Sequence, residues 1–194
     1  MRPRGVSVTT TREQVLAAAQ RHLNVDPTAS MAVLARAAGV GRATLHRHFA
    51  TRDDLVHEIA SRSLDRWEES QREAGVEAAV ASGDPETLRA CLTDVLSRFV
   101  TDADEFGFAL TDSYMTTSPA LLERSDALFA REVALYDAAQ QAGVLRSDVS
   151  ARWLGHAVYG LLVAAREALR EGEVARRDLD AVVVSTFLEG GAAR

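Results

Sequence analysis

The chain has 194 residues, of which 47% are hydrophobic and 26% are charged, and it contains only four prolines. This composition is typical of a folded helical protein and excludes an intrinsically disordered chain. Its single cysteine, Cys91, excludes an intramolecular disulfide, and no apolar run approaches the ~20 residues that a membrane-spanning helix needs. We therefore expect a cytoplasmic protein with no membrane partner.

The net charge of −6 is unevenly distributed along the chain. Residues 1–52 contain eight arginines and two acidic residues, a net charge of +6, whereas residues 53–194 contain 14 arginines and 26 acidic residues, a net charge of −12. A basic segment attracts phosphates and an acidic segment repels them. The distribution therefore favours DNA as a partner of the N-terminal part.

Apolar residues recur at three- and four-residue spacing along most of the chain, and no alternating strand pattern interrupts them, which predicts an all-α fold. The expected helix starts are marked by Thr10 with Glu13, Thr51 with Asp54, Asp84–Pro85 and Ser118–Pro119. The expected helix ends are marked by Gly39, Gly83, Gly143 and Gly172. About nine helices follow, at residues 11–23, 31–38, 42–48, 52–80, 85–102, 105–115, 119–142, 151–171 and 176–189.

The stretch from Met31 to Phe49 has the pattern of a helix-turn-helix. Two short helices that cross steeply need a small residue at their contact, a turn residue that takes positive φ, and apolar residues that hold the second helix. Ala35 and Gly39 meet the first two needs. The apolar positions are Leu34, Ala38, Val40 and Leu45.

The segment Thr44-Leu45-His46-Arg47-His48-Phe49, followed by Arg52 and Leu55, resembles the TetR family of bacterial regulators. The resemblance covers residues 11 to about 60, with two departures: His46 replaces the usual tyrosine, and Asn24-Val25-Asp26-Pro27 replaces the usual Gly-Tyr after the first helix. It implies a three-helix DNA-binding head at 11–56 with its helix-turn-helix at about 31–50, and a ligand-binding and dimerisation body at 57–194. The arginine- and threonine-rich residues 1–10 are expected to form a flexible arm.

DNA contacts are expected from the second helix of the helix-turn-helix, at residues 42–48, through the side chains that do not pack in the core. Arg42 and Arg47 suit the bidentate contact to guanine O6 and N7, and Arg42 is the strongest candidate for reading a base. The expected groove-facing residues are Gly41, Arg42, Ala43, Thr44, His46 and Arg47, and the resemblance adds phosphate contacts from Thr28, Ser30, Thr51 and Arg52. Phe49 and Leu55 are expected in the core.

One such unit buries too little surface for tight and specific binding, so a homodimer on a palindromic operator is expected. The apolar stripes of the last two helices are the predicted interface, through Trp153, Leu154, Ala157, Val158, Leu161, Leu162, Val182, Val183, Thr186 and Phe187. The resemblance also implies a pocket in the body, for which we expect a small hydrophobic or aromatic effector. Its predicted lining is Trp67, Phe99, Phe106, Phe108, Asp112, Tyr114, Met115 and Tyr159.

The chain lacks a nucleophile elbow, a phosphate-binding loop, a dinucleotide glycine pattern and a histidine or cysteine cluster with zinc spacing. We therefore expect no enzyme activity, no cofactor and no metal site. The prediction is a bacterial, nucleoid-associated repressor that an effector releases from DNA. The alternative is an activator or adaptor with the same head that responds to a protein partner or to no ligand.

Overall fold

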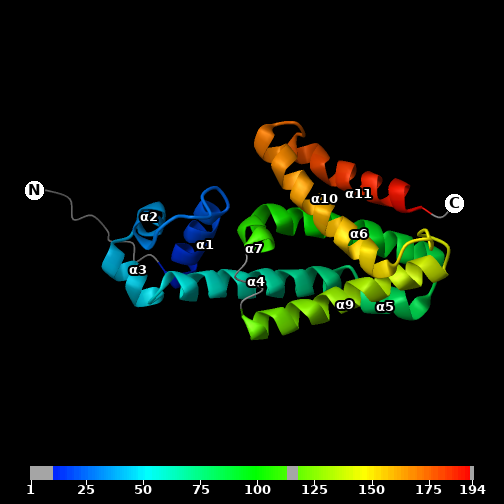
Figure 1. Cartoon of the computed structure of the whole chain (residues 1–194), viewed down its shortest axis with the longest axis horizontal. Coiled ribbons are helices and arrows are strands. Elements are labelled where there is room, and N and C mark those ends of the chain that lie inside the picture. The colour runs from blue at the N-terminus through cyan, green and yellow to red at the C-terminus, as the bar shows by residue number, and fades with distance from the viewer. Residues whose placement is uncertain (1–10, 113–117, 193–194) are drawn as a thin grey trace, which may run out of the picture. The chain divides into compact units, whose positions relative to one another are not determined.

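The computed structural model of the protein describes residues 11–112 and 118–192 (Figure 1). Within these ranges the chain is helical and has no β-strand, apart from an isolated bridge between Leu145 and Ala192, so the predicted all-α class is confirmed. None of the described helices combines the length and apolarity that crossing a membrane demands. The helices are α1 (Arg12–Leu23), α2 (Met31–Ala37), α3 (Arg42–His48), α4 (Arg52–Glu73), α5 (Val76–Ser82), α6 (Pro85–Glu105), α7 (Gly107–Thr111), α9 (Pro119–Gln141), α10 (Ala151–Glu171) and α11 (Arg176–Gly191).

The chain forms two compact units, Met1–Ile59 and Ala60–Arg194, and the boundary falls within α4. The first unit contains α1, α2, α3 and the start of α4. The second unit contains the rest of α4 and all later helices. The sequence places a functional division at residues 56 and 57, close to this boundary, and that division remains a prediction about function.

The first helix begins one residue later than the sequence pattern predicts. Its N-cap is Thr11, whose hydroxyl accepts a hydrogen bond from the Gln14 amide at 3.2 Å, while the Gln14 side chain accepts one from the Thr11 amide at 2.9 Å. A glutamine at the third helical position closes a capping box as a glutamate does. The capping box is therefore formed by Thr11 and Gln14 and not by the predicted pair of Thr10 and Glu13. Thr10 lies outside the described residues.

The predicted helix at 52–80 is two helices, because α4 ends at Glu73 and α5 begins at Val76. Gly75 between them has φ +70°, in the left-handed region that ends a helix. Sequence periodicity missed this break because apolar residues continue at helical spacing on both sides of the glycine. The four glycines that were predicted to end helices all have positive φ, as expected.

The core of the second unit is built from α6, α9, α10 and α11 with α5 packed against them. Tyr136 of α9 is fully buried, and its ring centroid lies 5.7 Å from that of Phe187 of α11. Figure 1 shows α10 and α11 side by side as an antiparallel pair, joined by a turn at Gly172. One face of each helix of this pair contributes to the core, and the other face is solvent-exposed in the single chain.

Candidate nucleic-acid interface and ligand cavity

The turn between α2 and α3 has the geometry that the helix-turn-helix pattern predicts. Gly39 has φ +68°, and its amide donates to the Arg36 carbonyl at 3.0 Å. The following amide, of Val40, donates to the Ala35 carbonyl at 2.9 Å, and the Ala35 side chain is almost fully buried. The predicted roles of Ala35 and Gly39 are therefore confirmed.

Helix α3 is held to the unit by one face. Leu45 and Phe49 are buried, as is Leu55 at the start of α4, so their prediction as core residues is confirmed. The other face is free, since Arg42, Ala43, His46 and Arg47 are exposed and Thr44 is half-buried. This arrangement presents a short, basic helix face to solvent, as reading a major groove requires.

The His46 ring has one of its two nitrogens engaged within the protein. Its Nδ1 lies 3.1 Å from the Ala50 carbonyl oxygen. Because a carbonyl only accepts hydrogen bonds, Nδ1 is the protonated nitrogen in this contact, and Nε2 of the neutral ring is an acceptor. A neutral His46 can therefore accept a hydrogen bond from a cytosine or adenine amino group in the major groove.

Two of the predicted phosphate-contacting residues already have partners in the protein. The Arg52 guanidinium donates to the Pro27 carbonyl at 2.6 Å and to the Ala29 carbonyl at 3.3 Å, which ties the start of α4 to the α1–α2 loop. The Thr28 hydroxyl donates to the Asp26 carboxylate at 2.7 Å, and this contact lowers the pKa of Asp26. Arg52 and Thr28 thus stabilise the α1–α2 loop, and their contacts with a phosphate stay a prediction.

The other predicted phosphate contacts lie at helix starts. Thr51 caps α4, since its hydroxyl accepts from the Asp54 amide at 3.0 Å and its own amide donates to the Asp54 carboxylate at 2.9 Å. Ser30 is the exposed N-cap residue of α2. Gly41 is the exposed N-cap residue of α3.

Sequence reasoning missed Arg36, an exposed residue of α2. A shallow groove between α2 and α3 is lined by Arg36 and Arg42 together with Ser30 and Gly41. The signal in the sequence was the pair of arginines on either side of the turn glycine. Two guanidinium groups beside one groove form a basic patch suited to a phosphate backbone.

The second unit contains a cavity of about 600 Å³. The residues that frame it come from α4, α6, α7, α9 and α10, and many of them are aromatic. Its aromatic lining consists of Trp67, Phe99, Phe106, Phe129, His156 and Tyr159. The rings of Trp67 and Phe99 meet edge to face at 6.4 Å between centroids, which fixes one wall.

The cavity wall between α9 and α10 depends on a glycine. A Cβ atom at Gly155 would lie 2.5 Å from the Phe129 ring, so only glycine lets the ring pack against α10. The Arg152 guanidinium lies over this ring at 5.0 Å, and the His156 ring lies 5.1 Å from it. Both basic side chains of the lining are therefore held at Phe129.

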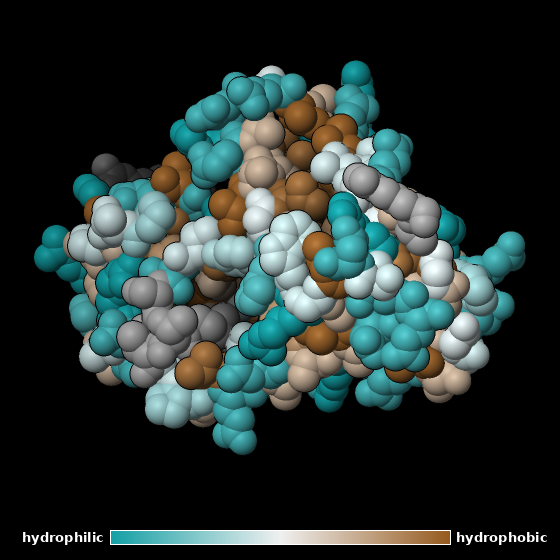
Figure 2. Space-filling model, turned by 45° about the vertical axis from the view of Figure 1, so that its right-hand side comes forward, coloured by the Kyte–Doolittle hydropathy of each residue, from teal (hydrophilic) through white to brown (hydrophobic). Residues whose placement is uncertain are grey.

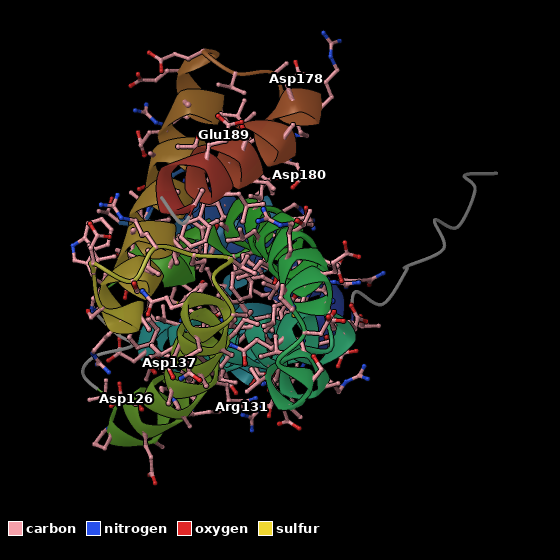
Figure 3. All side chains as sticks on the ribbon, turned by 90° about the vertical axis from the view of Figure 1, so that its right-hand side faces the viewer. Asp126, Arg131, Asp137, Asp178, Asp180 and Glu189 are labelled. Atoms are coloured by element: carbon pink, nitrogen blue, oxygen red, sulfur yellow. The ribbon has the colours of Figure 1, made fainter. Side chains whose placement is uncertain are left out.

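Four carboxyl groups line the cavity among the described residues, from Asp102, Asp112, Asp126 and Glu132. Asp102 accepts from Arg66 at 2.8 Å and from Ser70 at 2.5 Å, yet burial outweighs these contacts and raises its pKa. Asp126 lies on α9, where Figure 3 labels it with Arg131 and Asp137. The cavity is thus aromatic and acidic.

The cavity contains five of the eight predicted pocket residues: Trp67, Phe99, Phe106, Asp112 and Tyr159. Phe108 is buried in α7 and does not line it. Tyr114 and Met115 lie outside the described residues. Sequence reasoning missed Glu132, because it lies among apolar positions of α9 that are also compatible with a solid core.

The predicted dimer residues fall on two different faces of α10 and α11. Five of them are at most 7% exposed and pack in the core of their own chain, so they have almost no surface to offer a partner: Leu154, Val158, Leu162, Val183 and Phe187. The prediction therefore needs correction at these positions. The remaining five, Trp153, Ala157, Leu161, Val182 and Thr186, keep exposed or half-buried surface.

Large hydrophobic side chains are exposed on this outer surface of α10 and α11. Trp153 is 56% exposed and Val182 is 44% exposed. Figure 2 shows hydrophobic residues at the surface in its upper part, where α10 and α11 lie, and Figure 3 labels the acidic residues Asp178, Asp180 and Glu189 along α11. We call this surface, formed by Trp153, Ala157, Leu161, Val182 and Thr186, the outer face of the helix pair.

The fold and the exposed helix α3 define the class of the protein as a helix-turn-helix DNA-binding protein with a helical body. The sequence profile described as bacterial regulatory proteins, tetR family, matches residues 15–59, which contain α1 to α3 and the start of α4. Over these residues the chain matches the TetR family of transcriptional regulators, and the fold of the whole chain is TetR-like.

Relatives match almost the whole chain. The HTH-type transcriptional repressor LfrR of Mycolicibacterium smegmatis is 27% identical over 179 residues, which cover 90% of this chain and 87% of LfrR. The crystal structure of LfrR in complex with proflavine has a TM-score of 0.69 at 24% identity and covers 94% of this chain and 97% of that one. The ketosteroid regulator KstR2 of Mycobacterium tuberculosis has a TM-score of 0.74 at 14% identity, with 97% and 98% covered.

Proposed function

We propose that the protein is a homodimeric repressor that reads a palindromic operator with α3 and is released from it by a small-molecule effector. The observation that carries the proposal is the free face of α3, where Arg42, His46 and Arg47 are exposed while Leu45 anchors the helix. LfrR, whose name describes it as a repressor, supports this sign of regulation.

The outer face of the helix pair supports the dimer. Trp153 and Val182 are large apolar residues left exposed on adjacent helices, and apolar surface of this kind is typical of an interface between helix pairs that form a four-helix bundle. Two heads in one dimer would read two half-sites about one helical turn apart.

The cavity supports an effector. An adaptor that responds only to a protein partner would need no hollow body, whereas a cavity of about 600 Å³ is within the range of small-molecule sites. The LfrR structure that contains proflavine shares the fold over 94% of this chain, which supports a planar aromatic compound in the body. Effector binding would then shift α4 and change the spacing of the two heads.

Selection from random duplex DNA tests the proposal. The wild-type protein should recover a palindromic site, and Arg42→Ala should weaken binding by about 1–3 kcal/mol at one guanine position. Arg89→Ala is the matched control, because it removes the same charge from an exposed position on α6. Recovery of no motif, with equal and salt-sensitive binding by all three proteins, would refute specific operator recognition.

A reporter assay separates repressor from activator. The recovered site is placed over a promoter, and wild-type protein should lower expression. An increase in expression would support the activator alternative.

A further inference from the structure

Glu132 is unusual among the charged side chains of the described residues, because it is the only one that is buried. It is 4% exposed, lies in the middle of α9 and lines the cavity. Its carboxylate accepts a hydrogen bond from the Tyr136 hydroxyl at 2.6 Å, and Trp67 is a second donor to it. Both donors are neutral.

A buried carboxylate that only neutral donors stabilise is costly, because these donors do not replace the hydration of a full charge. The lining contains three further carboxyl groups, from Asp102, Asp112 and Asp126, of which Asp102 is paired with Arg66. The lining arginine does not neutralise Glu132, since Arg152 is exposed and lies over the Phe129 ring. A positive charge brought into the cavity would therefore be stabilised.

The aromatic lining suits the same ligand. The rings of Trp67, Phe99 and Phe129 offer faces that attract cations as well as hydrophobic surface that accepts flat rings. An anionic compound, by contrast, would lie in the same cavity as the buried carboxylate of Glu132 and be repelled by it.

We propose that the cavity binds a hydrophobic aromatic cation and that the carboxylate of Glu132 is its counter-ion. This inference rests on the proposed effector site and narrows the sequence-based expectation of a hydrophobic or aromatic effector to a positively charged one. Trp67, which donates to Glu132, belongs to α4, so a cation that engages Glu132 acts next to the helix whose first residues belong to the DNA-binding unit.

Binding of three fluorescent probes to the full-length protein at pH 8 tests the proposal: proflavine as the cation, acridone as a neutral ring system of similar size, and 8-anilinonaphthalene-1-sulfonate as the anion. The wild-type protein should bind proflavine tightest. Glu132→Gln keeps the shape of the side chain and should weaken proflavine binding about tenfold or more, with little effect on acridone. Asp137→Asn removes an exposed charge from the same helix and should change neither affinity.

Equal proflavine binding by wild type and Glu132→Gln would overturn the proposal. So would tighter binding of acridone or the anion by wild type, a comparison that does not depend on the variant being folded. The operator recovered by DNA selection keeps the two proposals apart. If an operator is found and proflavine fails to bind, the proposal of a cationic ligand is refuted, whereas the proposal of an operator-binding regulator is supported. If no operator is found, the proposed function is refuted, regardless of how the three fluorescent compounds bind.

Discussion

At the scale of the residue, burial in the fold changes the pKa of two neighbouring side chains, Glu132 and Tyr136. Burial raises the pKa of Glu132 to about 7, against the lowering effect of its hydrogen bonds from Tyr136 and Trp67. Burial also raises the pKa of Tyr136, which stays a neutral donor to it. Cys91 of α6 acts electrostatically on Tyr136, and the other titratable residues that line the cavity are Asp102, Asp112, Asp126, Arg152, His156 and Tyr159.

Glu132 predicts a pH dependence of stability. Its pKa is higher in the folded chain than its ordinary value of 4.5, so the folded state binds the proton more tightly. The stabilisation is fully present below pH ~4.5 and is lost as pH rises to about 7, for a total of roughly 3 kcal/mol. Melting temperatures of wild type should therefore fall over this range more than those of Glu132→Gln.

Asp137→Asn is the control for this titration, because Asp137 is an exposed acid on the same helix. Its melting curve should follow that of wild type at every pH. Parallel pH profiles for wild type and Glu132→Gln would show that the Glu132 carboxyl does not retain its proton in the fold.

At the scale of the element, helix ends follow local chemistry where a strong signal is present. The Asp84–Pro85 start of α6 is confirmed, since the Asp84 carboxylate accepts from the Thr87 amide at 2.8 Å. The break at Gly75 was missed, because a lone glycine inside an apolar pattern is tolerated in many helices. Only its left-handed φ makes it a helix end, where α5 leaves α4 and packs against α6 and α9.

Gly75→Ala should lower the free energy of unfolding by about 1 kcal/mol, because alanine is strained at positive φ. A Cβ atom there would meet nothing within 4 Å, so the effect comes from the backbone alone. Gly190→Ala is the matched control, since this glycine lies in α11 with equal open space and without positive φ. Urea unfolding should show a loss only for Gly75→Ala, and equal stabilities would refute the strain at Gly75.

At the scale of the whole molecule, the outer face of the helix pair carries the prediction of a dimer. Val182→Glu places a charge on this face, which is exposed in the single chain and therefore tolerant of it. In a dimer the charge would be buried without a partner, which should raise the dissociation constant about a hundredfold or more, near 2.7 kcal/mol. Light scattering after size exclusion should show a shift from two chains towards one.

Leu122→Glu serves as the control for the dimer, because Leu122 is 40% exposed on α9, outside the helix pair. This variant should keep the mass of wild type. A dimer that survives Val182→Glu unchanged, or that Leu122→Glu disrupts instead, would place the interface elsewhere.

The sequence by itself determined the all-α class, the helix-turn-helix and the free face of α3, because these depend on local periodicity, turn glycines and capping residues. The tertiary structure alone decided which stripe of α10 and α11 enters the core. Leu154 and Trp153 are neighbours in one apolar pattern, yet only Leu154 meets the core. The burial of Glu132 was beyond sequence reasoning for the same reason. Burial depends on contacts between helices far apart in the chain, which periodicity along one helix does not encode.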